Sequence, residues 1–203
     1  MKNKMIESFV DELEKIAEEK GINPFRDRAT IFLHDGKGNV LAAKQDPTDT
    51  EAPYHFPGGG VHENESLSSP IPSNRQVNKG LHREALEELG YKVKNIDNLG
   101  QQAREFVYSP AWQERVYQKR GERYLGIREH LRAAQVSKRD ESLLGSEGDS
   151  FYRFNPQFIS AKEMANALRQ HSRNERVHEG KRQNMESQAE FLDKLWSKRS
   201  QKG

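Results

Sequence analysis

Cysteine is absent from the 203-residue sequence. Its absence excludes disulfide bonds, thiolate zinc sites and cysteine nucleophiles. Long apolar runs are missing too: no segment approaches the ~18 apolar residues of a membrane-spanning helix. The N-terminus lacks the apolar core of a signal peptide and carries acidic residues soon after its start. We therefore expect a soluble, cytoplasmic protein.

Hydrophobic residues make up only 33% of the chain and charged residues 32%. The core should therefore be compact, with the surplus charge on solvated faces. The net charge of +2 is too small to indicate a nucleic-acid partner. Residues 160–203 lean basic, with ten Lys and Arg against six acidic residues. That segment either contacts a polyanion or forms solvated helical faces, and composition leaves both alternatives open.

Periodicity predicts a helix and then a hairpin in the first part of the chain. Apolar residues recur every three or four positions through the first twenty residues and end before Gly21, which indicates an amphipathic helix. Residues 29–44 read as two strands around a turn at 35–39, which is typical of a β-hairpin. A short aromatic strand at residues 54–56 then runs into three consecutive glycines.

The rest of the chain mixes helices and strands. A loop rich in proline and serine at residues 66–74 precedes a long helix. The segments expected after that helix are strands at 93–96, 101–107, 114–117 and 124–131, a polar loop at 138–150, and helices at 161–171 and 184–199. This order indicates an α/β fold, a mixed β-sheet covered by helices. We expect an N-terminal helix and linker (1–26), a catalytic domain (27–170) and a basic C-terminal helical extension (171–203).

The long helix has recognisable ends and an apolar stripe. Ser73 and Gln76 have the spacing of a capping box, and Gly90 fits the left-handed residue that ends a helix. The residues expected to face the core are Leu81, Ala85, Leu86 and Leu89. The sequence therefore predicts a helix whose orientation is set by this stripe.

Three carboxylates lie beside that stripe. At about 100° per residue, Glu84, Glu87 and Glu88 fall within an arc of about 100°. Like charges this close cost a helix a few tenths of a kcal/mol per pair, and a divalent cation removes that cost. Mg²⁺ prefers hard oxygen ligands and often bridges carboxylates to substrate phosphates. The alternative for these residues alone is a solvated acidic surface.

A nearby glycine turn favours a metal site over a solvated acidic surface. Gly58, Gly59 and Gly60 follow the aromatic strand and allow the backbone to approach a ligand or metal closely. Together with Glu65 and the segment Arg83–Gly90, they give a pattern that resembles the Nudix box. The five fixed positions of its second half would occur by chance in a chain of this length with a probability on the order of 10⁻⁴.

The resemblance is close in both halves of the box. The family signature has a glycine, five residues, a glutamate, seven residues, and then Arg-Glu-apolar-x-Glu-Glu-x-Gly-apolar. Gly59 and Glu65 match the first half. The residues that match the second half are Arg83, Glu84, Ala85, Glu87, Glu88, Gly90 and Tyr91. Seventeen residues separate Glu65 from Arg83 where the family has seven, so we expect the extra ten to bulge outward.

The resemblance implies an α/β/α sandwich with a mixed sheet, with the N- and C-terminal helices added to it. It also implies Mg²⁺ or Mn²⁺ bound by Glu84, Glu87 and Glu88, with the main-chain carbonyl of Gly58 as a further ligand. Family members cleave a diphosphate linkage in a nucleotide-like substrate, using a metal-activated water. Arg83 and Glu65 are then expected in the catalytic machinery, with Arg83 paired to Glu87.

Other site residues are less closely defined. In many relatives a late loop supplies a further acid; Glu147 and Asp149 lie where one is expected. The competing acids are Glu105, Glu114 and Glu122. Lys44 either meets a substrate phosphate or is a solvated lysine at a strand end. Aromatic and histidine side chains near the turn are expected in the core or at the substrate rim: Tyr54, His55, Phe56, His62 and Trp112.

Two alternatives to a small-nucleotide hydrolase remain. One is a catalytically inactive nucleotide-binding or structural module on the same fold. The other is a pyrophosphohydrolase that acts on capped RNA through the basic C-terminal helices, although these helices lack the aromatic residues of a stacking surface. The apolar stripes of the terminal helices leave either a monomer or a dimer open.

Overall fold

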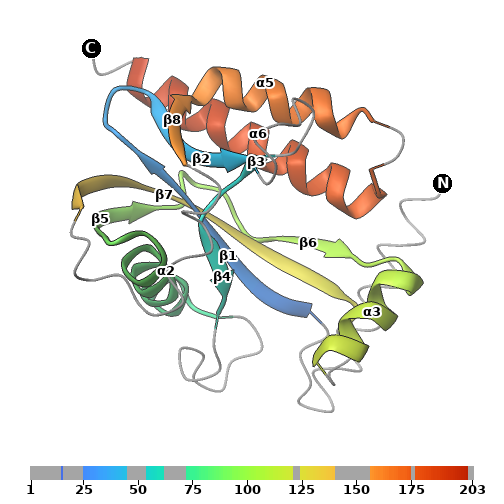
Figure 1. Ribbon diagram of the computed structural model, residues 1–203. Coiled ribbons are helices and arrows are strands. Elements are labelled where there is room, and N and C mark those ends of the chain that lie inside the picture. Colours follow the sequence, from blue (N-terminus) through green and yellow to red (C-terminus); the bar gives the residue numbers. More distant parts are fainter. Residues whose placement is uncertain are drawn as a thin grey trace.

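The computed structural model describes residues 25–44, 54–61, 72–120, 124–139, 156–174 and 177–200, together with Lys15. Its centre is a twisted β-sheet that contains two long strands (Figure 1). The strands are β1 (Phe25–His34), β2 (Asn39–Lys44), β3 (Tyr54–His55), β4 (Gly58–Gly60), β5 (Tyr91–Asp97), β6 (Arg104–Val107), β7 (Gly126–Arg139) and β8 (Gln157–Ser160). The helices are α2 (Asn74–Leu89), α3 (Pro110–Arg120), α5 (Ala161–Ser172) and α6 (Glu179–Ser200).

The sheet is mixed, as predicted. Its main order is β3-β2-β1-β7-β5, with β4 paired to β1, β6 to β7 and β8 to β2. β1 and β7 are parallel along ten residues, from Phe25 opposite Gly126 to His34 opposite Gln135. The other pairs are antiparallel. One parallel pair at the centre with antiparallel neighbours on both sides is a common arrangement in large sheets.

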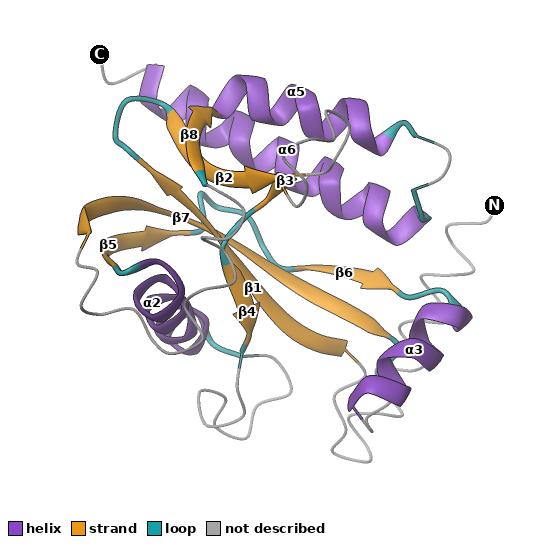
Figure 2. Ribbon diagram, in the orientation of Figure 1, coloured by secondary structure: helices purple, strands orange, loops and turns teal. Residues whose placement is uncertain are grey.

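Helices cover both faces of the sheet (Figure 2). We call the two faces the α2 face and the α6 face after the helix packed on each. On the α2 face, Ile31 and Leu33 of β1 pack with α2. On the α6 face, Phe32 packs with α5 and α6, and its ring lies 5.1 Å from that of Phe191. Odd residues of β1 therefore face α2 and even residues face α6, as the period of two in a strand requires.

The hairpin is confirmed, but its first strand begins earlier than predicted. β1 starts at Phe25, because Phe25 and the three charged residues after it, which the alternation did not mark as strand, pair with β7. In the turn, Asp35 accepts hydrogen bonds from the backbone N–H groups of Lys37 (2.6 Å) and Asn39 (3.1 Å). Trp196 of α6 packs directly against Gly38 of this turn.

The predicted strand at residues 114–117 is wrong, because this segment lies in helix α3. Ser109 precedes the helix and its hydroxyl accepts a hydrogen bond from Trp112 N (3.3 Å), while Pro110 occupies the first helical position. Gln118 donates to Glu114 one turn earlier. The alternation of polar and apolar residues in this short segment favoured a strand. The capping residues before it favour a helix instead.

Several other bounds differ from the prediction. β7 extends to Arg139, well past the predicted end at Leu131, because its second half pairs with both β1 and β5. β8 was not predicted and pairs with β2. α5 and α6 confirm the two closing helices, with α6 beginning earlier, at Glu179. The predicted N-terminal helix and the polar loop after residue 139 lie outside the described residues.

Among the described residues, no helix combines the length and apolarity needed to cross a membrane.

Candidate metal and phosphate site

Helix α2 is fixed at both ends by the residues that the sequence indicates. Ser73 Oγ accepts from Gln76 N (3.4 Å) and Gln76 Oε1 accepts from Ser73 N (2.6 Å), so the predicted capping box is present. Gly90 adopts φ 67°, and its N–H donates to Leu86 O (2.9 Å). This left-handed conformation is why glycine ends the helix.

The sheet determines which way α2 faces. Val77, Leu81, Ala85 and Leu89 are fully buried in the cluster that joins α2 to the sheet. Arg132 of β7 donates to Asn74 Oδ1 (2.8 Å) and holds the start of the helix. Burial lowers the pKa of Arg132 below its usual value. The carboxylate of Glu84, beside the apolar stripe, is thereby placed at the edge of the helix–sheet interface.

Strand β4 brings three glycines against β1. Gly58, Gly59 and Gly60 pair in antiparallel register with Thr30, Ala29 and Arg28, respectively. Gly58 has φ 156°, and a Cβ atom on it would collide with the main-chain carbonyl of Ala29 and lie 2.9 Å from Thr30 Cα. Position 58 therefore admits no side chain.

The central contact of the site joins β4 to α2. A Cβ atom placed on Gly59 would lie 2.5 Å from Glu84 Oε1 and 2.7 Å from its Cδ. The carboxylate of Glu84 therefore rests on the bare backbone of the glycine strand. The glycine turn and the acidic helix, 25 positions apart, come together although the intervening loop is longer than in the family signature.

Glu84 also has a cationic partner. Arg83 Nη2 lies 2.7 Å from Glu84 Oε1, and the exposed fractions of the two side chains are 30% and 12%. The expected partner of Arg83 was Glu87. The backbone of Glu87 and Glu88 lies in α2, but their side chains are outside the described set.

Three further predicted residues also lie outside the described part of the chain. Glu65, Glu147 and His62 have no described position. The same holds for the competing acids Asp149 and Glu122. Among the described side chains, no group of three or more His, Asp and Glu gathers in a way that could hold a metal. Glu84 is thus the one predicted carboxylate ligand whose side chain the structure describes.

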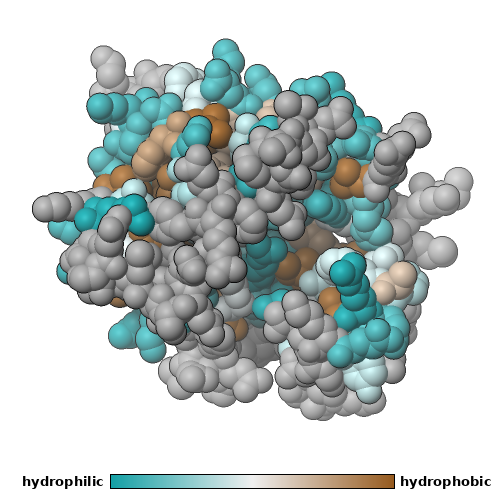
Figure 3. Space-filling model, viewed as in Figure 1, coloured by the Kyte–Doolittle hydropathy of each residue, from teal (hydrophilic) through white to brown (hydrophobic). Residues whose placement is uncertain are grey.

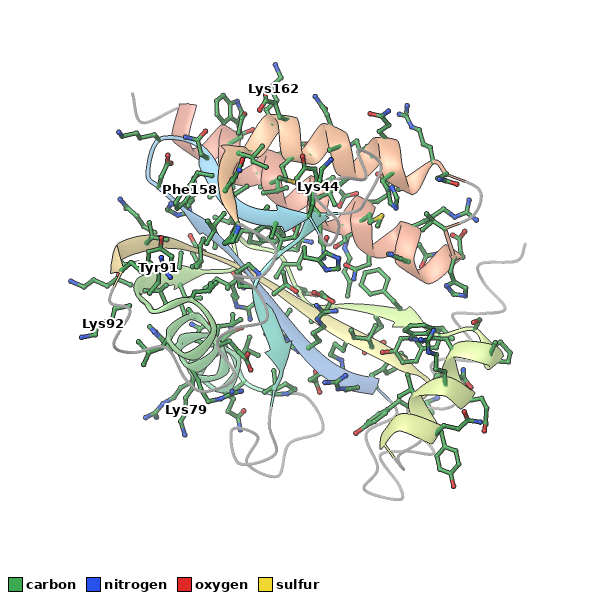
Figure 4. The ribbon with its side chains drawn as sticks, viewed as in Figure 1. Lys44, Lys79, Tyr91, Lys92, Phe158 and Lys162 are labelled. Carbon is green, nitrogen blue, oxygen red and sulfur yellow. The ribbon has the colours of Figure 1, made fainter. Side chains whose placement is uncertain are left out.

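The predicted substrate-rim residues have different surroundings. Lys44 ends β2 and its Nζ lies 5.3 Å from the centre of the Tyr54 ring (Figure 4). Phe56 is buried, with its ring 4.6 Å from that of Phe32, and so belongs to the core. Trp112, on α3, is 46% exposed and has the guanidinium of Arg115 5.2 Å above its ring.

A buried polar group on the α2 face was not indicated by the sequence. His130 Nε2 lies 2.7 Å from Asp27 Oδ1, and both side chains are less than one tenth exposed. Arg128 is 3.6 Å from Asp27 and 2.7 Å from Glu105, one of the candidate late acids. The contacts join β1, β6 and β7. Charged residues scattered over separate strands leave no local motif, so only the strand register reveals this group.

The α6 face of β4 carries positive charge. A Cβ atom on Gly60 would lie 3.0 Å from an Nη atom of Arg26. Arg28, two residues on, shares this face of β1. The pKa of His55 is lowered by burial and by the positive charges of Lys181 and Arg28. The glycine strand thus has a carboxylate on one face and guanidinium groups on the other.

The fold and site define a class of protein: an α/β/α sandwich in which a glycine strand meets an acidic helix. The sequence model of the NUDIX domain matches residues 24–177, and the chain belongs to this family. No curated protein sequence matches the chain.

Solved structures are similar to the chain at low sequence identity. A NUDIX hydrolase from Nitrosomonas europaea has 13% identity and a TM-score of 0.51, covering 86% of this chain and 90% of its own. The dihydroneopterin triphosphate pyrophosphohydrolase of E. coli has 13% identity and a TM-score of 0.45, covering 80% and 95%. An ADP compounds hydrolase has 16% identity and a TM-score of 0.45, covering 85% and 73%. The similarity to the Nitrosomonas europaea structure supports the assignment of the α/β/α fold.

Proposed function

We propose that this chain is a hydrolase that uses Mg²⁺ or Mn²⁺ to cleave a diphosphate linkage in a nucleotide-like substrate. The observation that carries the proposal is the contact between the Glu84 carboxylate and the bare backbone of Gly59. An acidic helix needs no such contact for its stability. A metal site needs it, because a cation can then be shared between helix carboxylates and main-chain oxygen.

The donor set fits a hard divalent cation. Glu84, Glu87 and Glu88 would supply carboxylate oxygens from one helix, and Gly58 a main-chain carbonyl, all of the type that Mg²⁺ and Mn²⁺ prefer. The cation, when bound, neutralises the diphosphate and lowers the pKa of the attacking water.

The remaining residues have supporting roles in the proposal. Arg83 holds the Glu84 carboxylate through their 2.7 Å ion pair. Glu87 or Glu88 accepts the proton of the attacking water. Glu65 and a late acid, for which Glu147 is the candidate, complete the acidic set. Lys44 would meet a substrate phosphate from the end of β2.

A substrate panel tests the proposal. The full-length protein is incubated with nucleoside triphosphates, nucleotide sugars, ADP-ribose and dinucleoside polyphosphates, with Mg²⁺ or with EDTA, and the products are separated by ion-exchange chromatography. We expect release of phosphorylated products from at least one member only when the metal is present. Turnover that persists in EDTA would contradict the metal requirement. No turnover on any member, together with no effect of Mg²⁺ on thermal stability, would instead favour an inactive module.

A further inference from the structure

Positive side chains from two separate elements lie on the α6 face of the sheet, the face opposite Glu84. Arg26 and Arg28 come from β1, and Lys181 from the first turns of α6. Asn184, one turn after Lys181 in α6, donates to Glu129 (3.3 Å), which lies opposite Arg28 in the register of β1 and β7. Lys181 and Arg28 both act on His55, and Arg26 lies against Gly60. Like charges repel, so this arrangement costs free energy unless an anion offsets it.

Among the described residues, neither Arg28 nor Lys181 has an ion pair with a carboxylate. Glu129 lies opposite Arg28 in the register of β1 and β7, and its two oxygens accept hydrogen bonds from Thr30 and Asn184 rather than from Arg28. This carboxylate therefore offsets the positive charge of the cluster without forming an ion pair with it. Lys181 is exposed, and Arg28 is partly exposed. Both can therefore reach a ligand.

The position of the cluster relates it to the proposed metal site. Gly59 faces Glu84 and the next residue, Gly60, faces Arg26, because successive residues of a strand point to opposite faces. In the described part of the sheet, β4 pairs only with β1, so its other edge has no strand beside it. A molecule that passes this edge would meet carboxylates on one face and guanidinium groups on the other. The space-filling view shows a hollow between α6 and α3 (Figure 3).

We propose that Arg26, Arg28 and Lys181 form an anion-binding site that receives a phosphate group of the substrate beyond the diphosphate held at Glu84. This inference rests on the proposed function and narrows its substrate. Guanidinium groups bind phosphate through paired hydrogen bonds, and an ammonium adds a point charge. The substrate class is then a nucleotide with a third phosphate or a phosphorylated second moiety. A nucleoside diphosphate joined to a neutral sugar would leave the cluster without its anion.

Histidine NMR tests the site without metal or turnover. Side-chain ¹H–¹⁵N spectra of the full-length protein are recorded against pH in EDTA, with and without inorganic pyrophosphate, and the His55 signal is assigned by its loss in His55→Asn. An anion bound between Arg28 and Lys181 favours the charged form of the nearby imidazole. We therefore expect pyrophosphate to raise the pKa of His55.

Variants show whether the cluster causes that rise. The double variant Arg28→Gln/Lys181→Met should abolish it. The control Lys162→Met removes a lysine of α5 that points away from the fold (Figure 4), and should retain it. An unchanged His55 pKa in the wild-type protein, or an equal rise in the double variant, would overturn the site.

Kinetics test whether the anion is part of the substrate. Lys181→Met should lower kcat/KM for a nucleoside triphosphate by roughly tenfold, the loss of one charge-assisted contact, and should leave a nucleotide sugar nearly unaffected. Equal effects on both substrates would contradict the proposed substrate class. If no substrate turned over while pyrophosphate still raised the His55 pKa, the anion site would stand and the proposed hydrolase function would fail.

Discussion

Glu84 and Gly59 lie so close together that a side chain at position 59 would have to displace the Glu84 carboxylate. A Cβ atom there would lie within 3 Å of Cδ and both carboxylate oxygens of Glu84. One helix residue and one strand residue thus define where the acidic side of α2 meets the backbone of β4. The proposed metal site depends on this contact between Glu84 and Gly59.

Gly59→Ala should displace the Glu84 carboxylate. The variant is expected to lower kcat at least tenfold and to raise the Mg²⁺ concentration needed for half-maximal rate, because a misplaced ligand weakens the metal site. Steady-state rates against Mg²⁺ concentration measure both effects. Gly60→Ala is the matched control. Its Cβ atom would lie 3.0 Å from the guanidinium tip of Arg26, and this flexible side chain can move aside. If Gly59→Ala and Gly60→Ala had the same Mg²⁺ dependence, the contact would have no role in metal binding.

Glu87→Gln and Glu88→Gln should each reduce turnover by several orders of magnitude and change thermal stability little. In the proposed site their charge acts on the metal and the attacking water rather than in the core. Single-turnover rates and thermal unfolding curves separate the two effects. The control is Glu163→Gln, which removes an exposed carboxylate from the first turn of α5. Near-wild-type rates in both box variants would show that the site is wrongly assigned.

Ser73→Ala removes one half of the capping box of α2. We expect a loss of about 1 kcal/mol in the free energy of unfolding, equivalent to a fall in Tm of roughly 2–4 °C for a chain of this size. The measurement is thermal unfolding by circular dichroism. Ser109→Ala, which removes the corresponding bond to Trp112 N at the start of α3, should cost less, because α3 adds no buried residue to the two described core clusters. An unaltered Tm in Ser73→Ala would count against the cap as a determinant of the helix position.

The pKa of His55 lies below its usual value of about 6.5, because burial and the charges of Lys181 and Arg28 disfavour the imidazolium. Above that value the imidazole is neutral in both the folded and the unfolded protein. As the pH falls through about 6.5, the unfolded chain takes up the proton first, so the free energy of unfolding decreases until the folded pKa is passed.

Urea unfolding at pH 7.5 and pH 5.5 measures this effect. We expect the wild-type protein to lose more stability between the two pH values than His55→Asn, and Lys181→Met to lose an intermediate amount. A loss that is identical in wild type and His55→Asn would mean that His55 titrates alike in both states.

Local chemistry made much of the site predictable. The capping box at Ser73, the stop at Gly90 and the apolar stripe with Leu81 and Leu89 are confirmed, because each depends on residues within one or two helical turns. The fold class followed from the same patterns and is confirmed. Glycines before the helix indicated a close backbone approach, and Gly59 makes one with Glu84.

Features set by distant contacts were not predictable. The length of β7 depends on pairing with β1, and β8 exists because it pairs with β2. Asp27 and His130 are 103 positions apart, and only the parallel register brings them together. Nothing local distinguishes Arg28 from any other charged residue in a strand, so its convergence with Lys181 appears only in the folded chain.

Binding of Mn²⁺ to the full-length protein, followed by electron paramagnetic resonance of the free ion, tests the central claim most directly. The claim predicts saturable binding by the wild-type protein, and binding weakened at least tenfold in Glu84→Gln/Glu88→Gln, since a lost carboxylate ligand removes both an oxygen and a charge. The Glu163→Gln control should bind as tightly as wild type. Equal Mn²⁺ affinity in the wild-type protein and in the double variant would contradict the claim that this helix holds the metal.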